Sequence, residues 1–342
     1  MSAPTTTRPP VAGEPAAPGP WSRVLRWSPS GRYLPVIATG VLFLTMFGAG
    51  GLRYEGFVDP QNFLSLFLDN AFLIVLAVGM TFVILTGGID LSVGSVVALS
   101  TMIAATTLEA GWSVPAAMVA VLVVATSLGL LMGVLVQHLQ IQPFIATLAG
   151  LFLARGICFM ISAESVPISN PEFLELSFTP IALPGGYFIR WSVVIALVVV
   201  SVAVWVLART RFGRTVYAVG SNEGSAVLMG LAVARTKVAV YAISGFCAGV
   251  GGILFTLYTP SGNSLHAVGM ELDAIAAVVI GGTLLTGGRG LVIGSVLGVL
   301  VLGTIKSFIV FENLNSWWTR IVVGVLVLVF VVIQRLLTRR RT

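Results

Sequence analysis

The sequence predicts an all-α membrane protein with about ten transmembrane helices and two pseudo-repeated halves. Of its 342 residues 57% are hydrophobic and only 9% are charged, whereas soluble domains carry roughly 25% charged residues. A helix needs about 20 apolar residues to cross a bilayer, and charge-poor runs of about that length recur along the chain. A similar glycine-rich segment occurs twice, 200 residues apart. This composition excludes a soluble enzyme and a nucleic-acid-binding protein.

The chain divides into a membrane domain and two terminal tails. Residues 1–30 hold 7 of the 16 prolines, and such a segment cannot bury a core, so we expect a disordered cytoplasmic tail. The membrane domain is expected over 31–337, followed by a basic cytoplasmic tail at 338–342. The predicted spans are 33–52, 70–89, 91–108, 114–136, 143–163, 191–208, 238–260, 272–288, 290–310 and 317–334.

The basic residues predict the orientation of these spans. With the N-terminus in the cytoplasm, 14 of the 19 Lys and Arg residues fall in inner segments, as the positive-inside rule requires. Ten of the 13 acidic residues fall in outer segments. Because the number of spans is even, both termini are predicted to be cytoplasmic. The basic residues left over are Arg53, Arg190, Lys306 and Arg320 in outer segments and Arg155 inside a span.

The repeat joins two pairs of consecutive spans. Thr86-Gly-Gly-Ile-Asp-Leu-Ser-Val-Gly-Ser95 matches Thr286-Gly-Gly-Arg-Gly-Leu-Val-Ile-Gly-Ser295 at six of ten positions. Glycine-rich turns between helices can resemble one another by chance. Because the match extends to Leu and Ser positions, we favour two related halves, an arrangement that many transporters show.

Asp90, within the first copy of the repeat, supports two interpretations. It can cap the helix that follows, since Asp accepts backbone hydrogen bonds at a helix start. It can also serve as a substrate or gating carboxylate, because ionisable groups at membrane depth are costly and usually functional. Arg289 occupies the neighbouring position in the second copy, so an ion pair between the two is a further hypothesis. For Arg155 we expect pairing or a place on a wet cavity rather than snorkelling.

Residues 209–237 form the longest basic inner loop. Asn222 can cap a short helix, and Gly230 can end it in the left-handed conformation. The apolar residues between them are too few to cross a membrane. Such a helix can lie on the lipid surface or dock in a groove of a cytoplasmic partner. The residues alone do not decide between these two interpretations.

Several catalytic signatures are missing from the sequence. It contains no G-x-x-x-x-G-K-[ST] phosphate loop, no H-E-x-x-H and no G-x-S-x-G, so the chain is not expected to be an enzyme or to hydrolyse ATP itself. Cys158 and Cys247 both lie in apolar stretches, and His138 and His266 stand alone, so the sequence indicates no metal or cofactor site. A stand-alone secondary transporter is the alternative function. Such a carrier should show several intramembrane carboxylates, and only Asp90 is a candidate.

Four segments of the chain resemble the permease subunits of bacterial sugar ABC importers of the ribose, xylose and galactofuranose branch. They are Asn70–Phe72, Ala77–Ser95, Arg209–Asn222 and Leu228–Gly230. Glu164–Ile168, Glu271–Thr283 and Ser316–Thr319 look closest to galactofuranose-type permeases. The resemblance runs from about residue 60 to 337. It is much more specific for the family than for the sugar, and the long N-terminal tail departs from it.

This resemblance implies a permease of the bacterial plasma membrane. Its partners would be a cytoplasmic ABC ATPase, an extracytoplasmic sugar-binding protein on the outer loops 164–190 and 261–272, and a second permease subunit, the same or a homologous chain. By position, the residues expected to couple to the ATPase are Gly213, Arg214, Tyr217, Gly220, Asn222, Ala226, Met229 and Gly230. The residues expected on the translocation path are Asn70, Thr81, Asp90, Ser92 and Ser95.

Overall fold

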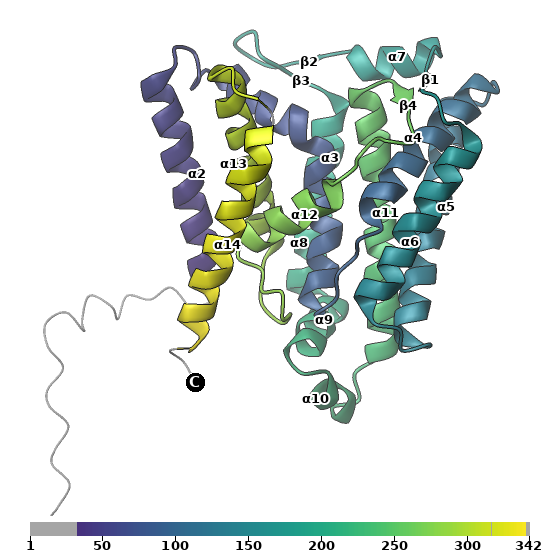
Figure 1. The fold of residues 1–342 in the computed structure, drawn as a ribbon, viewed down its shortest axis with the longest axis vertical. Helices are drawn as coiled ribbons and strands as arrows, with labels where there is room; N and C mark the ends of the chain where they lie inside the picture. The colour runs from purple at the N-terminus through teal and green to yellow at the C-terminus, as the bar shows by residue number, and fades with distance from the viewer. Residues whose placement is uncertain (1–32, 316, 340–342) are drawn as a thin grey trace, which may run out of the picture.

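The protein is predominantly helical in the computed structural model, which describes residues 33–315 and 317–339 (Figure 1). Ten of its helices correspond to the ten predicted spans, so the predicted all-α membrane architecture is confirmed. These helices are α2 Leu34–Arg53, α3 Pro60–Leu85, α4 Val93–Glu109, α5 Val114–Gln137, α6 Pro143–Ile161, α8 Trp191–Arg209, α11 Val233–Tyr258, α12 Met270–Ile280, α13 Val292–Phe311 and α14 Trp317–Arg339. The predicted tails 1–30 and 338–342 lie outside the described residues, except for residues 338 and 339, which end α14.

The prediction of the eighth span, 272–288, is wrong in its extent. The helix α12 has only 11 residues, a length of about 16 Å, and non-helical chain follows it. Among the described residues, seven helices are long and apolar enough to span a membrane, while α4 and the apolar part of α14 are somewhat shorter. The helix α3 begins ten residues before its predicted start, because Pro60 and the capping side chain of Asp59 initiate it before the apolar run.

Short elements lie at the two ends of the bundle (Figure 1). One end, called here the α7 end, carries α7 Pro171–Phe178 and two antiparallel strand pairs, β1 Val166–Pro167 with β4 Ser261–Gly262 and β2 Ile181–Ala182 with β3 Phe188–Ile189. The other, the α10 end, carries α9 Arg211–Ser221 and α10 Glu223–Leu228. The start of α2 and the end of α14 both lie toward the α10 end.

The helix α3 forms the centre of the core. Of its most apolar window, 89% is buried, against 17 to 33% for the peripheral helices α2, α5, α6 and α8. Glycines let α5 and α11 approach closely. A Cβ on Gly129 would lie 2.8 Å from the Cα of Gly245. The peripheral helices therefore present large apolar surfaces to their surroundings.

Candidate functional site

The turn between α8 and α9 requires a glycine. Thr210 caps α9 by accepting a hydrogen bond from the Gly213 amide at 3.1 Å. A Cβ on Gly213 would lie 2.6 Å from the Cα of Leu207, which is closer than real Cβ contacts. The absence of a side chain therefore lets α9 fold back directly beneath α8, while Arg214 beside it is exposed.

The helix α9 packs on the two glycine-rich turns of the repeat, which begin at Thr86 and Thr286 and are called here the glycine turns. A Cβ on Gly220 would collide with the carbonyl of Leu85 at the end of α3 and would lie 2.5 Å from the Gly288 amide. The two turns also contact each other, since the Gly288 amide donates to the Leu85 carbonyl at 2.9 Å. The hydroxyl of Tyr217 donates to the Gly290 carbonyl at 2.9 Å. The tertiary structure thus brings the two repeats together and places α9 against both.

The helix α10 has the caps that the sequence predicts. The Asn222 side chain accepts from the Ser225 amide at 2.8 Å, and Gly230 adopts a φ of +72°. Ala226 is fully buried against the remainder of the segment, whereas Leu228 is 90% exposed. Val227, Met229, Asn222 and Gly230 are exposed as well. An ion pair at 2.6 Å between Lys237 and Glu223 ties α10 to α11.

The five predicted path residues are all buried inside this chain. Asn70 donates to the Leu66 carbonyl at 2.9 Å and lies against Gly303 of α13. Thr81 hydrogen-bonds to Ser295 at 2.7 Å, which joins α3 to the second repeat. The Ser95 hydroxyl is buried without a hydrogen-bond partner among the described residues. Contacts between helices therefore surround these side chains in this conformation.

Asp90 is 1% exposed and makes a defined set of hydrogen bonds. Its Oδ1 accepts from the Ser92 amide at 3.0 Å and from the Ser92 hydroxyl at 2.6 Å. Its Oδ2 accepts from the Ser244 hydroxyl of α11 at 2.7 Å. Arg289 is exposed, and no ion pair joins it to Asp90 in the described part of the chain. The carboxylate therefore anchors the start of α4 to α11, although the N-cap residue of α4 is Ser92 and not Asp90.

Arg155 pairs rather than snorkels, as expected. Its guanidinium donates to the carbonyls of Ser264 and His266, the latter at 2.9 Å. These carbonyls belong to the 263–269 loop, which descends from the α7 end to α12 (Figure 1). Glu271 follows this loop and packs beside the backbone of Gly94. One carboxylate oxygen of Glu271, a residue within the predicted outer loop 261–272, is buried, whereas Glu164, Glu172 and Glu175 are exposed on the segment around α7.

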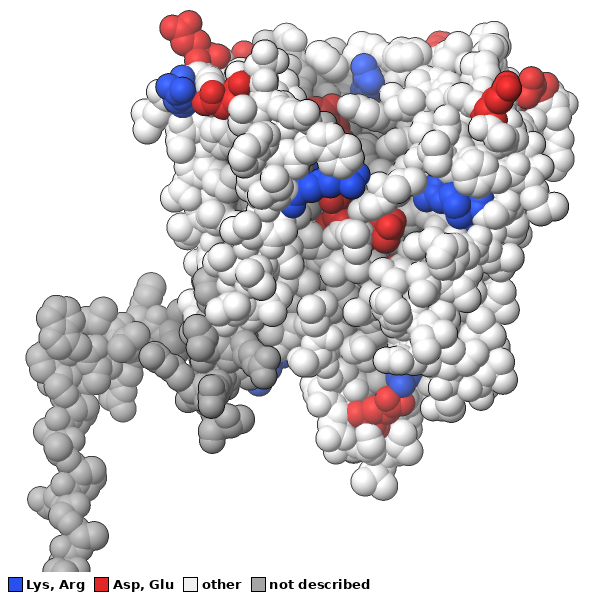
Figure 2. Space-filling view, in the orientation of Figure 1, with Lys and Arg blue, Asp and Glu red and all other residues white. Residues whose placement is uncertain are grey.

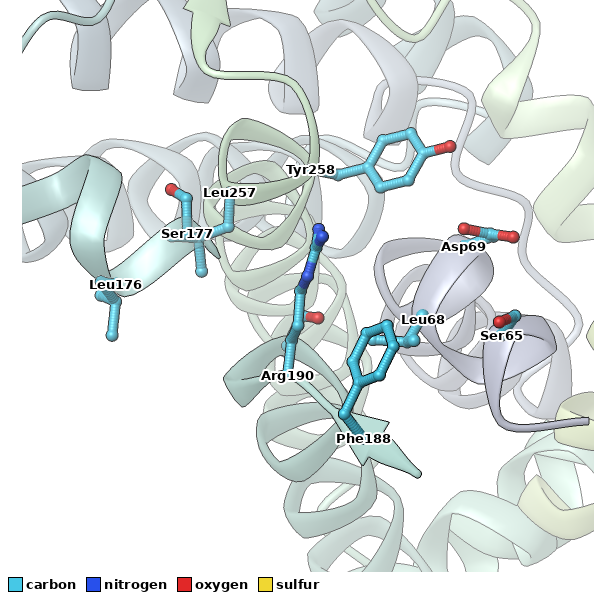
Figure 3. Close-up of a pocket in the computed structure, with 10 residues that line it drawn as sticks. Ser65, Leu68, Asp69, Leu176, Ser177, Phe188, Arg190, Leu257 and Tyr258 are labelled. Carbon is cyan, nitrogen blue, oxygen red and sulfur yellow. The ribbon is translucent and has the colours of Figure 1, made fainter. Parts of the chain in front are cut away.

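A polar pocket of about 180 Å³ opens at the α7 end (Figure 3). The side chain of Arg190, from the start of α8, lies between Ser177 of α7 and Asp69 of α3. Tyr258 at the end of α11 completes the charged and hydroxylated wall. Sequence reasoning missed this pocket, because its four walls come from segments far apart in the chain.

Sequence reasoning also missed the side chains that surround the turn at Asp90. Ser244 and Tyr241, which surround the Asp90 turn, lie about 150 residues from it along the chain. The one local signal was the glycine content of the repeat, since Gly88 lies against the Tyr241 hydroxyl and Gly94 against Glu271. Each such glycine marks a close approach but does not identify the group that approaches.

Comparison with known proteins gives one consistent family. Residues 62–331 match the family described as "Branched-chain amino acid transport system / permease component". The inner membrane ABC transporter permease protein YjfF of Escherichia coli is 43% identical over 309 residues, which cover 90% of this chain and 93% of that protein. The fructose import permease protein FruG of Bifidobacterium longum is 41% identical over 310 residues, covering 88% and 91%.

A further relative extends the same pattern. The ribose import permease protein RbsC of Bacillus subtilis is 37% identical over 281 residues, which cover 82% of this chain and 86% of that protein. No solved structure matches the chain. The matches run along nearly the whole bundle, and they confirm the resemblance to ABC importer permeases. The chain belongs to this family of multi-pass membrane permeases.

Proposed function

We propose that the chain is the transmembrane permease subunit of an ATP-driven monosaccharide importer of the bacterial plasma membrane. The observation that carries the proposal is the α9–α10 segment. It presents the exposed apolar residues Val227, Leu228 and Met229 at one end of the bundle, while its other face packs on both glycine turns. Relatives that cover most of the chain are named for fructose and ribose import, so the proposed cargo is a sugar of this class, with galactofuranose included.

In this proposal the α10 end is cytoplasmic, and so are both termini. A separate ATPase receives α10, because an exposed apolar helix fits a groove on a partner. The coupling residues then fall into two sets. Arg214, Asn222, Met229 and Gly230 face the ATPase, while Gly213, Tyr217, Gly220 and Ala226 transmit its movement to the bundle. The ATPase would hydrolyse the ATP, so this chain needs no catalytic residue or cofactor.

The α7 end is the proposed docking surface for an extracytoplasmic sugar-binding protein. Glu164, Glu172 and Glu175 are exposed there and offer an anionic face to basic residues of that partner. A second permease subunit, the same or a homologous chain, completes the membrane assembly. The five expected path residues are buried in this conformation, namely Asn70, Thr81, Asp90, Ser92 and Ser95. They would line the path only after their helices separate. Their place on the path stays a prediction.

The proposal is tested by reconstituting the permease with its ATPase and binding protein in proteoliposomes. Uptake of labelled ribose, fructose, allose and galactofuranose is measured with and without ATP. We expect ATP-dependent uptake of at least one sugar. We also expect Leu228→Gln to abolish sugar-stimulated ATP hydrolysis, whereas Leu52→Gln, at the far end of α2 and 94% exposed, should not. Uptake that needs no ATPase would identify a secondary transporter instead.

A further inference from the structure

The polar pocket at the α7 end holds two opposite charges that do not pair. Asp69 of α3 and Arg190 at the start of α8 both line it (Figure 3), and the charge of Arg190 acts on Asp69. No ion pair joins the two in the described part of the chain. The Arg190 Nε is buried and has no hydrogen-bond partner among the same residues. Because an unpaired buried donor is unfavourable, this guanidinium is available to a group that enters the pocket.

The two charges stand on different walls of the pocket. Asp69 and Ser65 both project from α3, one helical turn apart, and Arg190 lies across from them (Figure 3). Tyr258 of α11 lies within electrostatic range of both Asp69 and Arg190. The pocket therefore has one wall that is anionic and accepts hydrogen bonds, and another that is cationic and donates them.

The pocket lies at the depth where lipid headgroups meet the hydrocarbon. The helix α8 has 19 residues between its N-cap, Arg190, and its last residue, Arg209. Its length of about 28 Å matches the hydrocarbon thickness of a bilayer, about 30 Å. On the face shown in Figure 2, charged side chains gather at the margin of the α7 end, and uncharged surface follows directly below it. Arg190 and the pocket therefore lie at one boundary of the membrane.

The surface around and below the pocket suits lipid. Trp191 and Tyr258 are 45% and 47% exposed, and rings of these two kinds favour the membrane–water interface. Further along α8, four apolar side chains are more than two-fifths exposed, namely Leu197, Val198, Val202 and Trp205. Only 22% of this apolar helix is buried within the chain. Acyl chains attached to a headgroup in the pocket can lie along this surface.

We propose that the pocket binds the headgroup of a phospholipid that carries a primary amine, of which phosphatidylethanolamine is the simplest. Its phosphate binds Arg190, because guanidinium groups recognise phosphate oxygens through paired N–H donors. Its ammonium donates to Asp69 and to the hydroxyl of Ser65, and its acyl chains lie along α8. The inference does not depend on the sugar carried, and the pocket has the same depth in either orientation of the chain.

The acidic wall determines which phospholipid fits. A net anionic headgroup such as phosphatidylglycerol would bring its charge next to Asp69 without an ammonium to compensate, whereas a choline headgroup has no N–H to donate. The pocket volume of about 180 Å³ is below the range of about 300–1,000 Å³ for pockets that enclose drug-sized ligands. The pocket therefore suits a headgroup and leaves the acyl chains outside.

The test is native mass spectrometry of the delipidated full chain, titrated with three phospholipids that share the same acyl chains. We expect phosphatidylethanolamine to bind about fivefold more tightly than phosphatidylglycerol or phosphatidylcholine. Arg190→Gln should weaken binding of the first phosphatidylethanolamine about tenfold, because it removes the phosphate partner. The matched control is Arg209→Gln, at the exposed opposite end of α8, which should leave the preference unchanged.

Asp69→Asn tests the acidic wall separately. It should retain lipid binding but remove the preference for phosphatidylethanolamine, whereas Glu109→Gln, at an exposed glutamate that ends α4, should keep that preference. Arg190→Lys keeps the positive charge and should keep the preference as well. A loss seen in Arg190→Gln but not in Arg190→Lys therefore reports on the phosphate contact and not on misfolding.

A soluble headgroup distinguishes a lipid from a free solute. Glycerophosphoethanolamine should bind more than about tenfold more weakly than the lipid, because it has no acyl chains to bury against α8. Equal binding of the three lipids, unchanged binding by Arg190→Gln, or tight binding of the soluble compound would each overturn the proposal.

Discussion

The hydroxyl of Tyr217 in α9 donates to the carbonyl of Gly290, in the second glycine turn, at 2.9 Å. This bond links the segment at the α10 end to the loop that joins α12 and α13. Gly290 corresponds to Asp90 in the first repeat, and the two turns are anchored differently. Asp90 is bound to α11 through Ser244, whereas Gly290 is bound to the proposed coupling segment.

We expect Tyr217→Phe to weaken the connection between ATP hydrolysis and transport. A net hydrogen bond is worth about 1 kcal/mol, so uptake per ATP hydrolysed should fall about threefold to tenfold. The thermal midpoint of the purified protein should change little. The readout is simultaneous sugar uptake and phosphate release in proteoliposomes, with Tyr33→Phe, nearly half exposed, as the control. Unchanged coupling would show that the bond does not transmit movement.

Gly220→Ala should destabilise the contact between α9 and both turns. The added methyl would collide with the Leu85 carbonyl and crowd the Gly288 amide, and overpacking of this kind costs about 1–3 kcal/mol. Gly224→Ala is the matched control, because the nearest atom to its Cβ is the Asn222 Oδ1 at 3.5 Å. Thermal unfolding in detergent measures both. A midpoint for Gly220→Ala at or above that of Gly224→Ala would contradict the packing described here.

Asp90→Ala should lower the free energy of unfolding by about 1–3 kcal/mol, because it leaves the buried hydroxyls of Ser92 and Ser244 without their acceptor. Asp90→Asn should cost less, since it retains an acceptor oxygen. Thermal unfolding compares the two. For the ion-pair hypothesis, the double exchange Asp90→Arg with Arg289→Asp should recover nothing, because Arg289 is exposed and unpaired with Asp90. Recovery of expression and uptake in the double variant would restore that hypothesis.

The contact between the end of α2 and the end of α13 should weaken in acid. The hydrogen bond from Tyr54, followed by the charge of Arg53, lowers the pKa of Glu312 below its usual 4.5. A carboxyl group with a lowered pKa stabilises the folded state above its unfolded pKa, and this contribution is lost as the pH falls through the folded value. Glu312→Gln should therefore lower the thermal midpoint at pH 7.

The difference in midpoint between Glu312→Gln and the unaltered protein should shrink as the pH falls through the lowered pKa of Glu312, because that carboxylate then becomes protonated. Glu55→Gln, at an exposed glutamate in the same region, is the matched control for the loss of one negative charge. A difference that stayed constant from pH 7 to pH 3 would show that the charge of Glu312 is not what stabilises this contact.

The sequence by itself determined the ten apolar segments and the caps of α10. These features depend on local composition and spacing, so hydropathy and helical period predict them. The extent of α12 could not be predicted in this way. Residues 272–288 are apolar enough for a span, but Gly281 and Gly282 end the helix where they pack on Gly294 and Pro35, contacts that local hydropathy does not contain.

Only the tertiary structure decided which residues meet. It places Thr81 against Ser295, Asp90 against Ser244 and Arg155 against the loop before α12. It also buries the polar residues that the sequence placed on the path. The physical reason is that a side chain's surroundings depend on helices more than 100 residues away, whose packing is set by shape and hydrogen bonding across the whole bundle.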